Sequence, residues 1–149
     1  MPMYDERLVQ PMRHELTRIG FRELRTAADV DATLKDAKGT TLVVVNSICG
    51  CAARNARPAV AQALRNSARP EHLATVFAGQ DPDAAQRARA YFTGYAPSAP
   101  SVGLLKDGKL VFMLERWQIE GRPSGEIAED LVDAFNKYCE TAESTSGSL

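Results

Sequence analysis

The sequence is short of cysteine, of long apolar runs and of excess charge of either sign, and each shortage excludes a class of protein. Three cysteines in 149 residues are too few for the disulfide framework of a small secreted domain. The apolar runs are short, as at Leu42–Val45, so no segment is expected to cross a membrane, and the first residues lack the apolar core of a signal peptide. With 18 Lys and Arg against 19 Asp and Glu, the chain has no charge surplus that would attract nucleic acid or an anionic membrane. We therefore expect a cytoplasmic protein that binds neither.

What is present is the composition of an ordinary folded domain. Apolar residues make up 44% and charged residues 25% of the chain, which excludes an intrinsically disordered protein. A chain of this length forms one hydrophobic core and is too short for two ordinary domains. Beyond Cys139 the residues are mostly Glu, Thr, Ser and Gly, so we predict a single domain over residues 1–140 and a disordered tail over residues 141–149.

Hydrophobic patterning predicts an alternation of helices and strands. The predicted helices cover residues 11–19, 27–37, 52–64, 82–92 and 124–138, and the predicted strands cover residues 21–24, 40–47, 72–78, 102–105 and 110–114. Pro11 and the pair Asp81-Pro82 indicate helix starts, and the pair Asp107-Gly108 is typical of a hairpin turn. Strand–helix–strand units imply parallel pairing, and the hairpin adds antiparallel pairing. The expected fold is a three-layer α/β/α domain with a mixed central sheet.

Two of the cysteines lie where the clearest predicted strand gives way to a helix. Cys49-Gly50-Cys51 directly follows the strand at residues 40–47, and a helical pattern with a predicted kink at Pro58 comes next. Reactive groups in α/β sheets collect beyond the carboxyl ends of strands, and the free N–H groups of a helix start favour thiolate over thiol. Gly50 can adopt backbone angles closed to other residues, which helps the two sulfurs to approach each other. The motif predicts thiol–disulfide exchange, with Cys49 as the more thiolate-rich cysteine.

Two other interpretations of the pair are open, namely simple packing of small apolar side chains and half of a tetrahedral metal site. The remaining candidates for metal ligands are Cys139, His14 and His72, and each stands alone without a paired spacing. Cys139 falls on the apolar stripe of the last predicted helix, so we predict that it packs in the core. The two histidines are predicted to lie on a helix face and at a strand end.

Pro100 is the second notable feature, because it lies between the loop at residues 93–101 and the first strand of the hairpin. X–Pro bonds are the only peptide bonds with an appreciable cis population, although a trans proline is the general expectation in such a loop. The order of elements changes that expectation. A cysteine pair at a strand-to-helix turn, a further βα unit, and then a proline before a hairpin and a terminal helix is the arrangement of thioredoxin. It favours a cis Ala99–Pro100 bond that faces the cysteines.

Several segments stand in an order that is similar to the bacilliredoxin family of bacterial thioredoxin-fold proteins. They are residues 44–53 (VVNSICGCAA), 55–58 (NARP), 97–101 (PSAPS), 106–108 (KDG) and 119–121 (IEG). The resemblance covers the chain from about Leu8 to Tyr138. It implies a thioredoxin-like fold with an extra N-terminal helix.

The same resemblance implies roles for individual residues. Cys49 would be the attacking cysteine, Cys51 its partner and Pro100 the cis-proline. The supporting residues would be Gly50, Ser47 and Asn46. Trp117 stands in a stretch where many relatives have a histidine, and we expect it to pack or to shape the approach to the site.

The implied activity is removal of bacillithiol, or a similar low-molecular-weight thiol, from mixed disulfides on cytosolic proteins. No cofactor would be bound, and the small thiol would be a co-substrate. The partners would be S-thiolated proteins and a small-thiol or thioredoxin-type reducing system. The alternatives are a general protein disulfide isomerase or reductase and a non-enzymatic metal- or cluster-binding protein.

Overall fold

The computed structural model describes residues 3–140, and the tail predicted for residues 141–149 lies outside them. The helices are α1 (Glu6–Thr17), α2 (Ala27–Leu34), the π-helical turn η1 (Ala52–Ala56), α3 (Arg57–Ala63), α4 (Pro82–Arg89), α5 (Arg116–Ile119) and α6 (Ser124–Tyr138). The strands are β1 (Arg22–Glu23), β2 (Thr40–Asn46), β3 (His72–Phe77), β4 (Ser101–Lys106) and β5 (Lys109–Leu114). The predicted alternation of helices and strands is confirmed, and α5 is an element that the hydrophobic pattern does not predict.

The sheet is mixed, with the strand order β1-β3-β2-β4-β5. Its central strand, β2, is parallel to β3 and antiparallel to β4, and β4 forms a hairpin with β5. Every residue of β2 is buried, as its unbroken β-branched and apolar sequence predicts. In the hairpin turn Asp107 and Gly108 adopt φ values of 51° and 80°, the conformation that an Asp-Gly pair favours.

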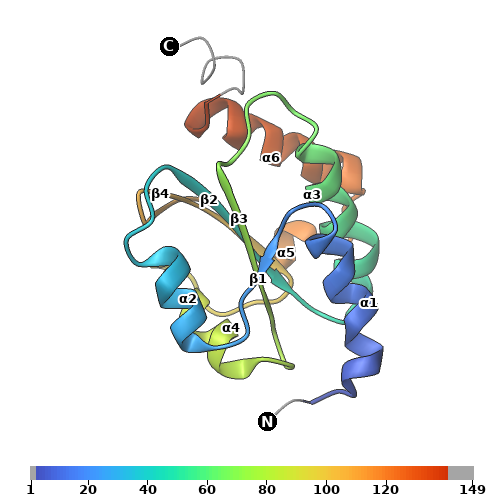
Figure 1. Ribbon diagram of the computed structural model, residues 1–149. Coiled ribbons are helices and arrows are strands. Elements are labelled where there is room, and N and C mark those ends of the chain that lie inside the picture. The colour runs from blue at the N-terminus through green and yellow to red at the C-terminus, as the bar shows by residue number, and fades with distance from the viewer. Residues whose placement is uncertain (1–2, 141–149) are drawn as a thin grey trace.

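Helices cover both faces of this sheet. Figure 1 shows α1, α3 and α6 on one face and α2 and α4 on the other. The side chains of β2 alternate between the two cores, so that Leu42 and Val44 pack on the first face and Val43 and Val45 on the second. The predicted three-layer α/β/α architecture is therefore confirmed. No helix within residues 3–140 has both the length and the hydropathy that a membrane span requires.

The first helix begins at Glu6 and not at Pro11, so that prediction is wrong. The carboxylate of Asp5 caps α1 by accepting the amide of Arg7 at 2.9 Å. Pro11 consequently lies in the second turn, where it has no N–H to donate to the carbonyl of Arg7. The helix tolerates this loss because Pro11 is exposed, so water can reach that side of the helix.

The fourth helix begins at Pro82 as predicted, but Asp81 does not cap it with its side chain. The Asp81 carboxylate instead accepts a hydrogen bond from Nη1 of Arg13 at 2.6 Å. Arg13 is 1% exposed and also pairs with Glu6 and Glu23. A buried guanidinium is costly without ionic partners, and Pro82 already removes one of the free N–H groups that a cap would satisfy. This Arg13 cluster (Arg13 with Glu6, Glu23 and Asp81) joins α1, β1 and the start of α4.

Candidate active site

The carboxyl end of β2 carries the cysteine pair. The strand ends at Asn46, and Cys49 and Cys51 follow in the turn before η1. Both thiols are free and partly buried, so neither is a fully packed core residue. This position, beyond the end of the central strand, is the one that the sequence predicts.

Pro100 reaches the same edge of the sheet from the other direction. Val45 of β2 pairs with Ser101 of β4, and the strands are antiparallel, so Pro100 stands beside the end of β2. The Ala99–Pro100 bond is cis, as predicted. The fold thus brings the cysteine turn and the Pro100 loop together.

Asn46 and Ser47, the predicted supporting residues, hold the strand end in place. Asn46 Nδ2 donates to the carbonyl of Met12 at 3.2 Å, and its Oδ1 accepts the amide of Ser47 at 2.9 Å. Nη1 of Arg57 donates to Asn46 Oδ1 at 2.9 Å and to the Ser47 carbonyl at 3.0 Å. Arg57 is 3% exposed and forms an ion pair with Glu15 at 3.2 Å. The strand end is therefore fixed to both α1 and α3 through Arg57, which the sequence does not single out.

Ser47 also shapes the turn that carries Cys49. Its Oγ accepts the amide of Cys49 at 3.0 Å, and the carbonyl of Cys49 accepts the amide of Ala52 at 3.0 Å. The next helix starts as the π-helical turn η1 and continues as α3. This change of helix type stands where the sequence predicts a kink, because Pro58 has no N–H with which to close a regular α-helical turn.

Gly50 has a different role from the one that its position between two cysteines suggests. Its backbone is helical and its φ lies outside the left-handed region, so the prediction of angles closed to other residues is wrong. The space of its missing side chain is needed by Arg54, because a Cβ at Gly50 would lie 2.6 Å from Arg54 Nη2. Glycine therefore lets a guanidinium lie against the backbone between Cys49 and Cys51.

The two thiols differ in acidity. Partial burial by itself disfavours the Cys49 thiolate, but hydrogen bonds from the Cys51 thiol, the Ser47 hydroxyl and backbone amides outweigh it and lower the pKa of Cys49. Burial raises the pKa of Cys51, and its hydrogen bond to Cys49 and the charge of the Cys49 thiolate raise it further. Arg116 partly opposes that rise. The pair is arranged for Cys49 to ionise first while Cys51 keeps its proton.

Removing a donor to Cys49 should raise the pKa of Cys49. We expect Ser47→Ala and Cys51→Ala each to raise it, because each variant loses one hydrogen bond to the thiolate, and Cys51→Ser, which keeps a donor, to raise it less. The rate of iodoacetamide alkylation at Cys49, followed by peptide mass spectrometry, measures this pKa. Alkylation should fall as pH drops through the Cys49 pKa, with a midpoint below the ~8.5 of a free thiol. Equal and unshifted midpoints for Cys49 and Cys51 would contradict the geometry.

An open cleft of about 520 Å³ lies in front of the cysteines. Its walls come from separate segments, namely the cysteine turn with η1, the α5 region and the turn before α6. The charged residues that line it are three arginines, Arg54, Arg116 and Arg122, and one acid, Glu120. A concave surface with this balance attracts anionic groups.

Arg116 connects the cleft to the Pro100 loop. Its Nη1 donates to the carbonyl of Ala99 at 3.2 Å, and its Nε pairs with Glu120 at 3.0 Å. The guanidinium is close enough to Cys51 to favour that thiolate electrostatically. Sequence reasoning missed this residue, although the capping box formed by Glu115 and Gln118 is a signal that would have predicted α5.

The other candidate ligands stay apart from the pair. Cys139 is partly buried, packs against the core as predicted, and has its pKa raised by burial. His14 is exposed on α1, and His72 is exposed at the start of β3, as predicted. Within the described residues no group of three or more His, Cys, Asp or Glu side chains could hold a metal ion. Among residues 3–140, the cysteine pair therefore has no further ligands beside it for a tetrahedral site.

Trp117 does not pack, so that part of its prediction is wrong. The side chain is 72% exposed, and its Nε1 donates to Glu115 at 2.9 Å. It follows Arg116 in α5, next to the cleft, so a role in shaping the approach to the site stays a prediction.

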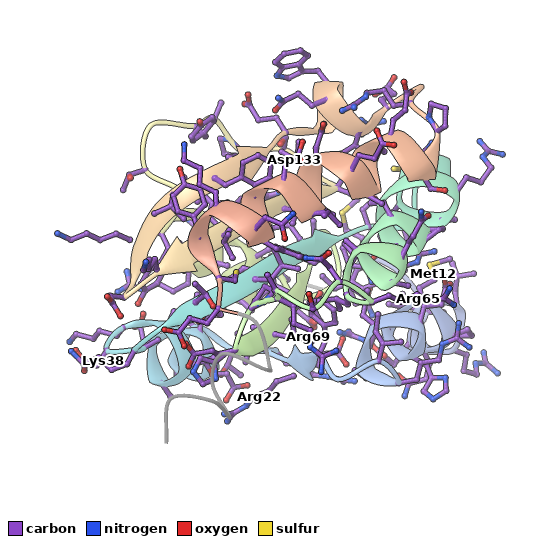
Figure 2. The ribbon with its side chains drawn as sticks, turned by 90° about the horizontal axis from the view of Figure 1, so that it is seen from above. Met12, Arg22, Lys38, Arg65, Arg69 and Asp133 are labelled. Carbon is purple, nitrogen blue, oxygen red and sulfur yellow. The ribbon has the colours of Figure 1, made fainter. Side chains whose placement is uncertain are left out.

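A second cleft of about 530 Å³ lies at the opposite end of the sheet, where β3 begins. Arg22 and Lys38, both labelled in Figure 2, lie on its wall together with His72. No cysteine lines this cleft, so it has no thiol nucleophile.

Comparison with known proteins agrees with this geometry. Residues 4–139 match the family described as disulphide isomerase. A bacilliredoxin of Koribacter versatilis is 51% identical over 137 residues, which cover 92% of this chain and 94% of that protein. A bacilliredoxin of Geobacillus kaustophilus is 53% identical over 137 residues, which cover 91% of this chain and 94% of that protein. The chain belongs to the bacilliredoxin family.

Solved structures place this bacilliredoxin family member in the thioredoxin fold. The thioredoxin of Fasciola hepatica superposes with a TM-score of 0.55 at 22% identity, over 79% of this chain and 99% of that one. A mutant thioredoxin of Halobacterium salinarum gives a TM-score of 0.52 at 14% identity, over 80% of this chain and 91% of that one. Bacilliredoxin membership and this fold together identify a thiol–disulfide oxidoreductase.

Proposed function

We propose that the protein removes bacillithiol, or a similar small thiol, from mixed disulfides on cytosolic proteins, with Cys49 as the attacking group. The observation that carries the proposal is the opposite shift of the two thiol pKa values beside an open cleft. Thiolate is the nucleophile in disulfide exchange, so the cysteine with the lowered pKa is the one that attacks. The names of its relatives support bacillithiol as the thiol removed.

The proposed first step moves the small thiol, here called the cap, from client to enzyme. The Cys49 thiolate attacks the sulfur of the cap and forms a new S–S bond. The old S–S bond breaks, and the client cysteine leaves as a thiolate that takes a proton from water. One disulfide is lost and one is formed, so no external oxidant or reductant is needed.

The proposed second step releases the cap. Cys51 holds its proton at neutral pH, because its pKa is raised. Once Cys49 is in a disulfide its negative charge is gone, so the thiolate of Cys51 becomes easier to form. Attack of Cys51 on the Cys49 sulfur expels the cap as a thiolate and leaves a Cys49–Cys51 disulfide. A second small thiol can instead attack the sulfur of the cap, which forms a disulfide of the two small thiols and frees the Cys49 thiolate. Where the Cys49–Cys51 disulfide has formed, a small-thiol or thioredoxin-type reducing system restores the dithiol.

The roles of the other site residues follow from their contacts. Ser47 hydrogen-bonds to Cys49, and Asn46 and Arg57 fix the strand end on which that contact depends. The Pro100 loop, fastened by Arg116, forms the neighbouring wall of the site in this proposal.

Intact-mass spectrometry tests the proposal. Reduced protein is mixed under anaerobic conditions with a client protein that carries one bacillithiol cap. The client should lose the cap, and the enzyme should either carry the cap or lose two hydrogens as the Cys49–Cys51 disulfide. A client that keeps its cap under these conditions would refute the proposal.

A second candidate function is general disulfide isomerisation, which the description of the matching family favours. This reaction requires attack on a client sulfur, so the client itself becomes attached to Cys49. Recovery of activity from a scrambled disulfide protein measures it. Isomerisation would be the better assignment if a covalent client–enzyme adduct forms and if the scrambled protein regains activity faster than the capped client loses its cap.

A further inference from the structure

The arginine that lies over Gly50 has no task in the exchange chemistry described so far. Arg54 belongs to η1 and lines the cleft beside the cysteine pair. Its terminal nitrogen lies within 2.6 Å of the position that a Gly50 Cβ would occupy, so the guanidinium lies over the backbone between the two thiols. A ligand attached to Cys49 would meet it.

Arg54 also differs from the other arginines of the cleft in its partners. Arg116 pairs with Glu120 at 3.0 Å, and Arg122 pairs with Asp130 at 2.8 Å. Arg54 forms no ion pair or side-chain hydrogen bond within residues 3–140. The donors that lower the pKa of Cys49 are Cys51, Ser47 and backbone amides, so the N–H groups of Arg54 are free for a ligand.

The chemistry of a free guanidinium restricts what that ligand carries. Its planar set of N–H donors matches a carboxylate with two parallel hydrogen bonds, and it stays charged at every physiological pH. The three arginines against one acid in the cleft also favour an anion over a neutral or cationic group.

The geometry points to Arg54 as the residue that binds a carboxylate of the cap, so that the site selects anionic over neutral small thiols. This inference rests on the proposed function, because it assigns the recognition of the cap in the same site. The carboxylate belongs to the cap, because the Arg54 guanidinium lies against the backbone of Gly50, next to the cysteine to which the cap becomes attached.

A pair of matched caps tests this inference. One client protein is capped on the same cysteine either with mercaptosuccinate, which has two carboxylates, or with 1-thioglycerol, which is neutral and of similar size. The second-order rate of decapping is measured for both caps with the unmodified protein, Arg54→Gln and Arg54→Lys. Arg65→Gln is the control, because this substitution removes one positive charge outside the cleft. Arg65 is exposed, does not line the cleft and is labelled in Figure 2.

We expect Arg54→Gln to lower the ratio of the mercaptosuccinate rate to the thioglycerol rate about tenfold, the effect of one charge-assisted hydrogen bond. The ratio for Arg54→Lys should lie between the ratios for the unmodified protein and for Arg54→Gln, and Arg65→Gln should keep the ratio of the unmodified protein. Raising the salt concentration from about 0.05 to about 0.5 M should also lower the ratio for the unmodified protein. An equal loss of rate for both caps in Arg54→Gln would overturn the inference, since Arg54 would then act on Cys49 or on the client.

Removal of a bacillithiol cap by the unmodified protein, measured in parallel, separates this inference from the proposed function. If bacillithiol is removed but the cap ratio is the same in Arg54→Gln, the inference about Arg54 alone is wrong. If no cap is removed, the proposed function is wrong and the inference falls with it.

Discussion

Alanine in place of Cys49 should abolish decapping, whereas alanine in place of Cys51 should still permit one round of it. The first variant removes the nucleophile, and we expect the rate to fall at least about 1000-fold, to the uncatalysed background. The second variant keeps Cys49 but loses the thiol that lowers the Cys49 pKa. It should react more slowly, by about tenfold or less at neutral pH, because a smaller fraction of Cys49 is thiolate.

Single-turnover kinetics with a capped client measure both variants, with the amount of free client thiol as the readout. Cys51→Ser is the matched control, since a hydroxyl can donate to Cys49 but cannot resolve a disulfide. Its single-turnover rate should therefore exceed that of Cys51→Ala. If Cys51→Ala is as inactive as Cys49→Ala, transfer of the cap to a single thiol is excluded.

Replacement of Arg13 by methionine should cause a large loss of stability. Arg13 is 1% exposed and pairs with the carboxylates of Glu6, Glu23 and Asp81. It also lies 5.4 Å from the ring centre of Phe77. Removing the cation leaves Asp81 without an ion pair among the described residues, and leaves Glu6 and Glu23 with only the half-exposed Arg25, at 3.9 and 3.5 Å. A broken buried ion pair costs about 3–5 kcal/mol of unfolding free energy.

Arg7→Met is the matched control, because it breaks the ion pair between Arg7 and Asp5, whose side chains are 91% and 54% exposed. This change should lower the unfolding free energy much less than Arg13→Met does, because water screens an exposed ion pair. Urea unfolding followed by circular dichroism measures both variants. An equal effect of Arg7→Met and Arg13→Met would contradict the role of the cluster.

The loss of unfolding free energy in Arg13→Met should also depend on pH. The hydrogen bond from Arg13 lowers the pKa of Glu6, so the stability that it contributes is present at neutral pH and is lost as pH falls through this lowered value. In Arg13→Met the same acids repel each other, and protonation relieves the repulsion. The difference in unfolding free energy between the two proteins should therefore shrink as the pH is lowered from about 7 to about 3.

The elements that could be predicted from the sequence are those with a local signal. The apolar run of β2 and the Asp107-Gly108 turn each determine their structure within a few residues. The same is true of the apolar stripe of α6. The cysteine pair was predicted for the same reason, because it stands between a clear strand and a clear helix.

One wrong prediction concerns a side chain whose partner is distant in the chain. Asp81 has the composition and position of a helix cap, but its partner Arg13 is 68 residues away. Pro11 marks a helix start by its own chemistry, yet the capping residue is Asp5 and the helix extends beyond the proline. Local signals do not contain the contact between Asp81 and Arg13, whereas Asp5 is itself a local capping signal that competes with the signal of Pro11.

The cleft was missed for a related reason. Arg54, Arg116 and Arg122 come from separate segments, and in the sequence each resembles any solvent-exposed arginine. Even the local contact between Arg54 and Gly50 was hidden, because a glycine between two cysteines suggests backbone freedom and not room for a neighbouring side chain.

The position of the cap after one turnover tests the central claim, that the Cys49 thiolate accepts it. The Cys51→Ala protein is reacted with a bacillithiol-capped client, quenched with acid, digested and analysed by tandem mass spectrometry. The absence of Cys51 prevents release of the cap through the internal disulfide. The account predicts one cap on Cys49 for each client thiol set free. A cap on Cys139, or a client joined to Cys49 by a disulfide, would contradict it.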